Sequence, residues 1–239
     1  MQSISDLVQA STFIFSGTVL ELGASSVPFV PPSEKLITAR LDKSLRTDPV
    51  LGDLRGKTIT IAVGSAEQFK AGQRVVFLAN SWVHGRGIAV REVAHLEAGQ
   101  ADRVAAAVAE LPQRHLIDRL QDAEVVVQGK ISKIDPPGFS LDQHDGRWAA
   151  AYLHVTATFK GSAPQPAVFY FATAEWPPWN RAPRFEKGQA GVFILHLPPP
   201  DTVKEDGTLP AGALVALDHA DFQDESQAGR IKKILAALK

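Results

Sequence analysis

The chain contains no cysteine among its 239 residues. Without a thiol it forms no disulfide, offers no thiolate nucleophile and builds no zinc or iron–sulfur site of the cysteine-ligated kind. A protein that needs no disulfide fits a reducing compartment, so we expect a cytoplasmic protein.

Long apolar runs are also missing. No segment approaches the roughly 18 consecutive apolar residues that a membrane-spanning helix needs. The N-terminal stretch, residues 1–6, has neither the basic region nor the apolar region of a signal peptide. The sequence as given therefore predicts no membrane contact. A secreted or periplasmic location is the alternative if a signal peptide has been removed.

Charge of one sign is not in excess. The chain has 25 Lys and Arg against 26 Asp and Glu. Divided after Pro112, the first part carries 11 basic and 11 acidic residues, which leaves 14 and 15 in the second. Neither part has the basic surplus that binds a phosphate backbone, so the composition disfavours a nucleic-acid partner.

What the chain does contain is an internal repeat. Residues 6–17 match residues 118–129 without a gap, and both segments keep an apolar run before a glycine. Residues 69–78 match residues 185–194, with five of the ten positions identical, including the Phe-x-x-Gly-Gln motif. The identical pairs in the first match are Asp6/Asp118, Gln9/Gln121 and Gly17/Gly129.

The ends of the two segments agree as well. Apolar residues recur at a spacing of three or four in 103–111 and in 230–238, which predicts a closing helix in each copy. Three matches in the same order predict a tandem duplication, with one domain at 1–112 and another at 113–239. A linker near 111–113 must be short.

Each copy is expected to hold five strands. A short helix with Asp near its start precedes them, at 5–10 or 116–122. Short β-branched and aromatic segments predict strands rather than helices. The fold class is therefore mainly β with short helices: a duplicated five-stranded β-barrel of the oligonucleotide-binding (OB) kind, each copy closed by a C-terminal helix. The expected strands are 12–22, a second around 37–45, 58–63, 74–79 and 88–96, then 124–134, a second around 152–160, 167–173, 190–197 and 213–220.

Three segments carry a resemblance to known proteins. These are Phe15-Ser-Gly-Thr-Val, the alternating strand that ends in Leu45-Arg46, and the motif Phe-x-x-Gly-Gln-x-x-Val-Phe. Together they resemble bacterial OB-fold domains that are related in shape to the tissue inhibitors of metalloproteinases and the netrin module. Those inhibitors place an N-terminal cysteine on the zinc of a protease, so this chain cannot share that activity.

No motif assigns a catalytic residue or a cofactor. The segment 52–58 has three residues between its glycines instead of the four of a phosphate-binding loop, and a strand follows it. A Gly-x-Ser-x-Gly nucleophile motif is absent from the sequence. His95 and His219 occupy similar places before the closing helices, where packing explains them better than chemistry. Four acidic residues near these junctions are expected to cap helices: Glu92, Glu97, Asp218 and Asp221.

One segment could hold a metal ion. Asp142, His144 and Asp145 offer carboxylate and imidazole ligands close together. They lie in a polar loop, where such residues usually face water, so they are only weak candidates.

The two copies differ most in their loops. The second copy spends twelve residues between its third and fourth strands and includes Trp176, Trp179 and Arg181. Tryptophan and proline make good recognition surfaces because little conformational entropy is lost on binding. The alternative is that both rings fold back over the barrel mouth onto Trp148. In the first copy, the connection between strands four and five holds Trp82, His84 and Arg86. These three residues and Trp148 join Trp176, Trp179 and Arg181 as the candidate binding residues.

These features favour a non-enzymatic binding or adaptor protein that recognises a protein or peptide partner through loops at the barrel ends. One alternative is a metal-dependent or hydrolytic enzyme that uses loop His and carboxylate residues. Another is single-stranded nucleic-acid binding, in which a base stacks on Trp82.

Overall fold

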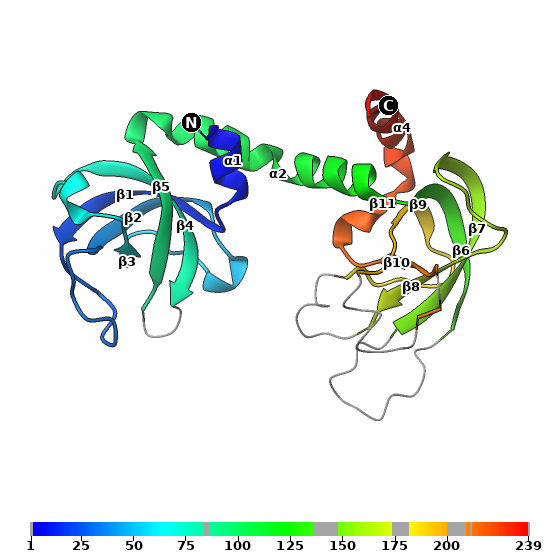
Figure 1. Ribbon diagram of the computed structural model, residues 1–239, viewed down its shortest axis with the longest axis horizontal. Coiled ribbons are helices and arrows are strands. Elements are labelled where there is room, and N and C mark those ends of the chain that lie inside the picture. Colours follow the sequence, from blue (N-terminus) through cyan, green and yellow to red (C-terminus); the bar gives the residue numbers. More distant parts are fainter. Residues whose placement is uncertain are drawn as a thin grey trace. The chain divides into compact units, whose positions relative to one another are not determined.

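A computed structural model describes residues 2–83, 87–135, 148–173, 182–199, 209–210 and 212–238. The chain divides into two compact units, Met1–Pro112 and Gln113–Lys239 (Figure 1). Each unit is mainly β, with a sheet that carries helices on its outer face.

Unit 1 is a closed barrel with the strand order β1-β2-β3-β5-β4. β3 and β5 run parallel, and the other neighbours are antiparallel. Stacked Phe15 and Phe77 fill the interior, with ring centroids 5.2 Å apart. The strands are β1 (Phe13–Leu22), β2 (Leu36–Arg46), β3 (Thr58–Ala62), β4 (Arg74–Val83) and β5 (Ala89–Glu97).

Side chains alternate between the two faces of these strands. On β4, Phe77 points into the barrel, while Val76 and Leu78 point outward. The outward residues are covered by α1 (Ile4–Gln9) and by the start of α2 (Ala101–Asp122). As expected, an acidic residue stabilises the start of α1, where Ser3 and Asp6 form a capping box.

Unit 2 is a six-stranded sheet with the order β10-β8-β7-β6-β9-β11. β10 is parallel to β8, β11 is antiparallel to β9, and an isolated bridge joins His196 to Val215 of β10. The last turns of α2 and the helix α4 (Ala228–Ala237) pack on its outer face. The strands are β6 (Val125–Asp135), β7 (Trp148–Lys160), β8 (Ala167–Ala172), β9 (Ala190–Leu195), β10 (Leu214–Ala216) and β11 (Phe222–Asp224).

Two expectations from the sequence were wrong. The single strand predicted at 213–220 is two short strands, β10 and β11, separated by a 3-10 turn at His219–Asp221 that has its own capping box. The helix and linker predicted around 111–122 are one continuous helix, α2, with Pro112 and Asp118 inside it. Proline removes one backbone hydrogen bond here, but the helix continues through it.

The glycine shared by the two matched segments has a physical cause in both units. A Cβ at Gly17 would lie 2.7 Å from the carbonyl oxygen of Arg40 on β2. At Gly129 it would lie 2.5 Å from the carbonyl oxygen of His154 on β7. Both glycines sit at a register shift between the first two strands of their sheet. The strands approach so closely there that only glycine fits.

Gly17→Ala and Gly129→Ala are therefore each expected to lower the free energy of unfolding by about 1–3 kcal/mol, the usual cost of overpacking. Urea unfolding followed by circular dichroism measures the loss. Gly64→Ala is the matched control, because nothing lies within 4 Å of its Cβ position. Equal stability of all three variants would contradict the close approach.

Candidate functional site

An exposed tryptophan marks one end of the unit 1 barrel. Trp82 lies near the end of β4, and its side chain is 42% exposed. The guanidinium carbon of Arg91, on β5, lies 5.8 Å from the centroid of the Trp82 ring. Trp82 lies at an irregularity in the β4–β5 pairing, between the pairs Ser81–Val90 and Val83–Ala89, and the Arg91 side chain restricts its ring on one side.

The loop 23–35 is folded against the same end of the barrel. The backbone N–H of Ser26 donates to Thr60 Oγ1 at 2.8 Å, which attaches the loop to β3. Val27 is buried and touches the position where Gly87 would carry a Cβ, so the loop contacts the β4–β5 connection. Two residues further on, Phe29 is presented to solvent with 61% of its surface exposed.

A hollow of about 490 Å³ lies at the base of this loop. Its walls come from the end of β1, the end of the loop 23–35 and the segment that follows β3. Leu22, which is 43% exposed, lies on its border, and Glu34, Lys35 and Glu67 supply charges of both signs. We call Leu22, Phe29, Trp82 and Arg91 the end surface of unit 1.

In the second unit, the end of β6, the start of β7 and the end of β8 lie at one end of the sheet. Asp135 at the end of β6 pairs with Ala150, and Trp148 at the start of β7 pairs with Ala172 at the end of β8. The connections that leave these strands therefore start from the same end of the sheet (Figure 1). The remaining residues named from the sequence lie outside the described residues: His84, Arg86, Asp142, His144, Asp145, Trp176, Trp179 and Arg181.

Trp148 lies within the described part of the chain. Its side chain is 8% exposed and belongs to a small buried cluster. Its buried neighbours are Ala172, Ala182, Leu209, Ala213 and Val215. This ring is a packing residue at the end of the sheet, whereas Trp82 faces solvent.

A cluster of charged and ionisable side chains in unit 2 surrounds Asp221, whose surface is fully buried. Arg119 of α2 holds the carboxylate with two hydrogen bonds, Nε to Oδ1 at 2.7 Å and Nη2 to Oδ2 at 2.6 Å. The backbone N–H groups of Leu217 and Asp218 donate to Oδ2 as well. His196 Nε2 lies 3.2 Å from Oδ1, outside good hydrogen-bond geometry.

Asp218 lies beside this cluster, and two histidines contact it. His115 Nε2 and His219 Nδ1 lie 2.9 and 3.3 Å from its Oδ1. Asp218 and Asp221 cap the 3-10 turn and not the closing helix α4, which has no side-chain cap, so the expectation that they cap that helix was wrong. Glu92 instead contacts His95 Nδ1 at 2.5 Å, and Glu97 makes no side-chain cap.

The expected equivalence of His95 and His219 is wrong. His95 pairs with Phe77 on β4, whereas Phe222 pairs with the matching Phe193 on β9. Phe222 therefore takes the place of His95 against the barrel core, and His219 lies in the turn that splits the fifth strand. His219 does not correspond to His95 because the 3-10 turn interrupts the fifth strand of unit 2, whereas β5 of unit 1 is continuous.

The electrostatics of the two aspartates suit anchoring rather than acid catalysis. Burial raises the pKa of the Asp221 carboxyl, but contacts from His196 and Arg119 outweigh it and hold the pKa below its usual value. Burial likewise raises the pKa of Asp218, and the Ala220 N–H and His115 outweigh it. A general acid near neutral pH needs the opposite shift. Among the described residues, no three His, Asp or Glu side chains are grouped to hold a metal ion.

The sequence did not identify two side chains that contact Asp221, the guanidinium of Arg119 and the imidazole of His196. The one available signal was the matched repeat, in which Arg119 aligns with Leu7. An arginine that replaces an apolar residue on a helix facing the sheet indicates a buried anion elsewhere. The position of that anion, 102 residues away, depended on the fold.

No protein-family model matches the chain, and no curated protein sequence matches it. Over the described residues, none of the helices combines the length and apolar character required to cross a bilayer.

Asp221→Asn is expected to lower the free energy of unfolding of unit 2 by about 3–5 kcal/mol, because it leaves Arg119 without its counter-charge. A carboxyl with a lowered pKa stabilises the fold above its unfolded pKa, and this contribution is lost as the pH falls through its folded pKa. Stability of the wild type should therefore fall below about pH 4, and the variant should lose less over the same range.

Tryptophan fluorescence suits this measurement, because three of the four tryptophans, Trp148, Trp176 and Trp179, belong to unit 2. Asp102→Asn, an exposed change on α2, is the control. Parallel pH profiles for the wild type and Asp221→Asn would show that the buried pair does not set the acid sensitivity.

Proposed function

We propose that the protein is a non-enzymatic binding or adaptor protein that recognises a protein or peptide partner through the ends of its β-sheets. The observation that carries this proposal is Trp82, held on a paired strand with Arg91 against its ring and left 42% exposed. Large exposed aromatic and arginine side chains contribute most of the affinity at protein interfaces. Restriction of the Trp82 ring by Arg91 reduces the entropy lost on binding.

The end surface of unit 1 also indicates what such a partner carries. Trp82, Phe29 and Leu22 offer apolar area, and an aromatic or aliphatic side chain of a peptide would cover it. Arg91 and Lys35 supply donors for a neighbouring carboxylate. The preferred partner is therefore a segment in which an apolar anchor stands next to an acidic residue.

We also propose that the two units are OB-type folds that arose from one unit by tandem duplication. Two features support it beyond the matched sequence. In unit 1 the third strand, β3, runs parallel to β5. In unit 2 the third strand, β8, runs parallel to β10 in the same way. In each unit the shared glycine lies where the second strand approaches too closely for a side chain. OB-type barrels use the connections at this end to bind ligands.

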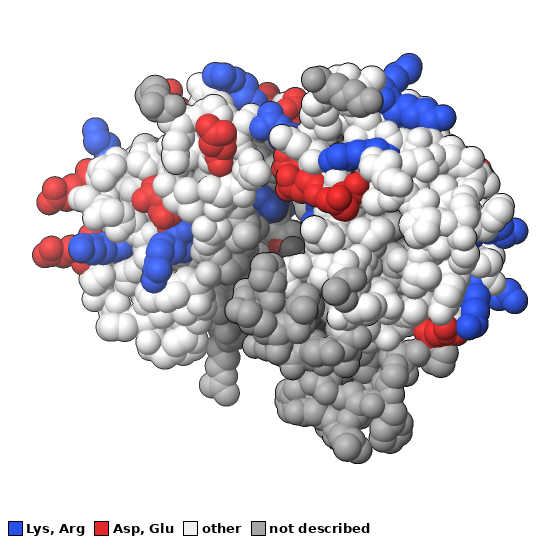
Figure 2. All heavy atoms as spheres, turned by 45° about the vertical axis from the view of Figure 1, so that its right-hand side comes forward, with Lys and Arg blue, Asp and Glu red and all other residues white. Residues whose placement is uncertain are grey.

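The other function classes receive less support. Hydrolytic or metal-dependent chemistry would need a carboxylate with a raised pKa or grouped ligands, and Asp218 and Asp221 both have lowered pKa values. A phosphate backbone would need a surface of one sign. Figure 2 shows Lys and Arg side chains interspersed with Asp and Glu on the face that it draws. Elemental analysis of the native protein would test for a metal at Asp142, His144 and Asp145.

Trp82→Ala is expected to weaken binding of a selected peptide by at least about fivefold, because removal of an interface anchor costs more than about 1 kcal/mol. Peptides are first enriched from a displayed random library on the immobilised wild-type protein. Their dissociation constants are then measured by fluorescence anisotropy, with salt varied to detect binding through charge alone.

Val50→Ser is the matched control, because Val50 is 90% exposed and lies in the 3-10 turn Pro49–Leu51, beyond the far end of β2. Its affinity should equal that of the wild type. If no peptide is enriched, or if Trp82→Ala binds as tightly as the wild type, the end surface is not the recognition site. Steep weakening with salt would instead favour an oligonucleotide-type partner.

A further inference from the structure

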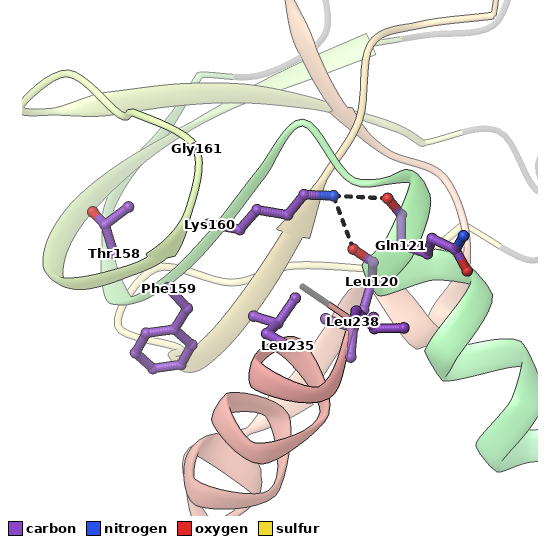
Figure 3. Close-up of a pocket in the computed structure, with 8 residues that line it drawn as sticks. All are labelled: Leu120, Gln121, Thr158, Phe159, Lys160, Gly161, Leu235 and Leu238. Atoms are coloured by element: carbon purple, nitrogen blue, oxygen red, sulfur yellow. Dashed lines mark hydrogen bonds between the residues drawn. The ribbon is translucent and has the colours of Figure 1, made fainter.

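Unit 2 contains a pocket on the side of the sheet covered by helices. It lies between the end of β7, the last turn of α2 and the last turn of α4 (Figure 3). Its volume is about 380 Å³, within the range of small-molecule sites. The lining residues are Leu120, Gln121, Thr158, Phe159, Lys160, Gly161, Leu235 and Leu238.

The walls of the pocket combine apolar and polar surface in similar amounts. Leu120 and Leu235 are buried, while Leu238 is 41% exposed at the edge. In Figure 3, Leu235 of α4 and Leu238, which follows the helix, lie below the Lys160 side chain. Phe159 extends the apolar wall toward α4, where the Lys232 ammonium lies 4.6 Å from its ring centroid. An alkyl chain placed here would remove apolar surface from water, which favours binding.

A cation lies at the inner edge of this wall. Lys160 Nζ donates to the carbonyl oxygens of Leu120 at 3.1 Å and Gln121 at 2.7 Å. These carbonyls end α2, where the helix dipole is negative. An ammonium has three N–H donors, and within the described residues these two carbonyls take two of them. The third donor and the positive charge are suited to a carboxylate.

Helix capping alone does not explain the hollow. In unit 1, Arg46 Nη1 donates to the carbonyls of Val8 and Ser11 and so caps α1 in the same manner. Beside it, Leu45 and Leu111 pack into one cluster with α1 and β4. Leu111 aligns with Leu238, the exposed leucine at the pocket. The two units therefore share the helix cap, but the aligned leucine packs into a cluster in unit 1 and is partly exposed in unit 2.

We propose that this pocket binds a free medium-chain aliphatic carboxylate. Its alkyl chain would lie against Phe159, Leu235 and Leu238, and its carboxylate would accept a hydrogen bond from Lys160 Nζ. The site lies wholly within unit 2 and is independent of the peptide-binding proposal for unit 1. Loss of one activity therefore leaves the other intact.

The first test is a chain-length series on the full protein by isothermal titration calorimetry. Hexanoate, octanoate and decanoate are compared, each below its critical micelle concentration. The dissociation constant is expected to fall about fourfold for each added methylene, the value for burial of one such group. Decanol, which lacks the charge, should bind at least tenfold more weakly than decanoate, since a hydrogen bond to a charged group is lost.

Two pairs of variants locate the site. Leu238→Trp should fill the mouth and abolish decanoate binding, whereas Leu197→Trp, at another exposed leucine of unit 2, should not. Lys160→Met should remove the preference for decanoate over decanol, whereas Arg46→Met, which removes the matching cap in unit 1, should preserve it. Circular dichroism checks that each variant is folded.

The proposal is overturned if decanoate shows no binding at millimolar concentration, or if Leu238→Trp binds it as tightly as the wild type. Retention of the decanoate preference in Lys160→Met would also overturn it, because the anion would then be bound elsewhere. If Lys160→Met fails to fold, the proposal is tested by Leu238→Trp and Leu197→Trp. Loss of decanoate binding in the first variant alone supports it, and equal binding by both overturns it.

Discussion

The fold of each unit depends on the pairing that links its third strand to its fourth strand. In unit 1, β5 runs unbroken and pairs parallel with β3 and antiparallel with β4, which closes the barrel. In unit 2 the same pairings are divided between β10 and β11. The turn between them is fixed by Asp221, buried against Arg119 of α2. This ion pair thus fixes the turn at which the chain passes from β10 to β11.

Each unit has one sheet face that is covered by helices and one end at which the strands are connected. Outward residues of β4 and of β6 and β9 are covered by helices, so that surface is committed to packing. The opposite end carries the connections between strands, and in unit 1 it presents Trp82 and Phe29 to solvent. A rigid sheet with adaptable connections at one end is a common basis for recognition.

Much of the strand pattern was predictable, because it follows from local sequence. Alternating residues such as Ile37, Ala39 and Leu41 gave β2, and the apolar run before Gly17 gave β1. The split fifth strand and the Arg119–Asp221 pair were not predictable, since they arise from contacts between distant segments. The same holds for the site: Trp82 could be named from the sequence, but its place on a strand beside Arg91 depends on strand register.

The Arg119–Asp221 pair has a consequence for how the sequence can vary through time. Loss of Arg119 alone leaves the buried Asp221 charge uncompensated, and loss of Asp221 alone leaves Arg119 without its partner. Either change costs several kcal/mol and would be removed by selection. An apolar replacement needs two codon changes in one lineage, at positions 102 residues apart. Relatives that keep the split fifth strand should therefore show the two positions changing together, and an alignment would reveal the pair as a correlated substitution.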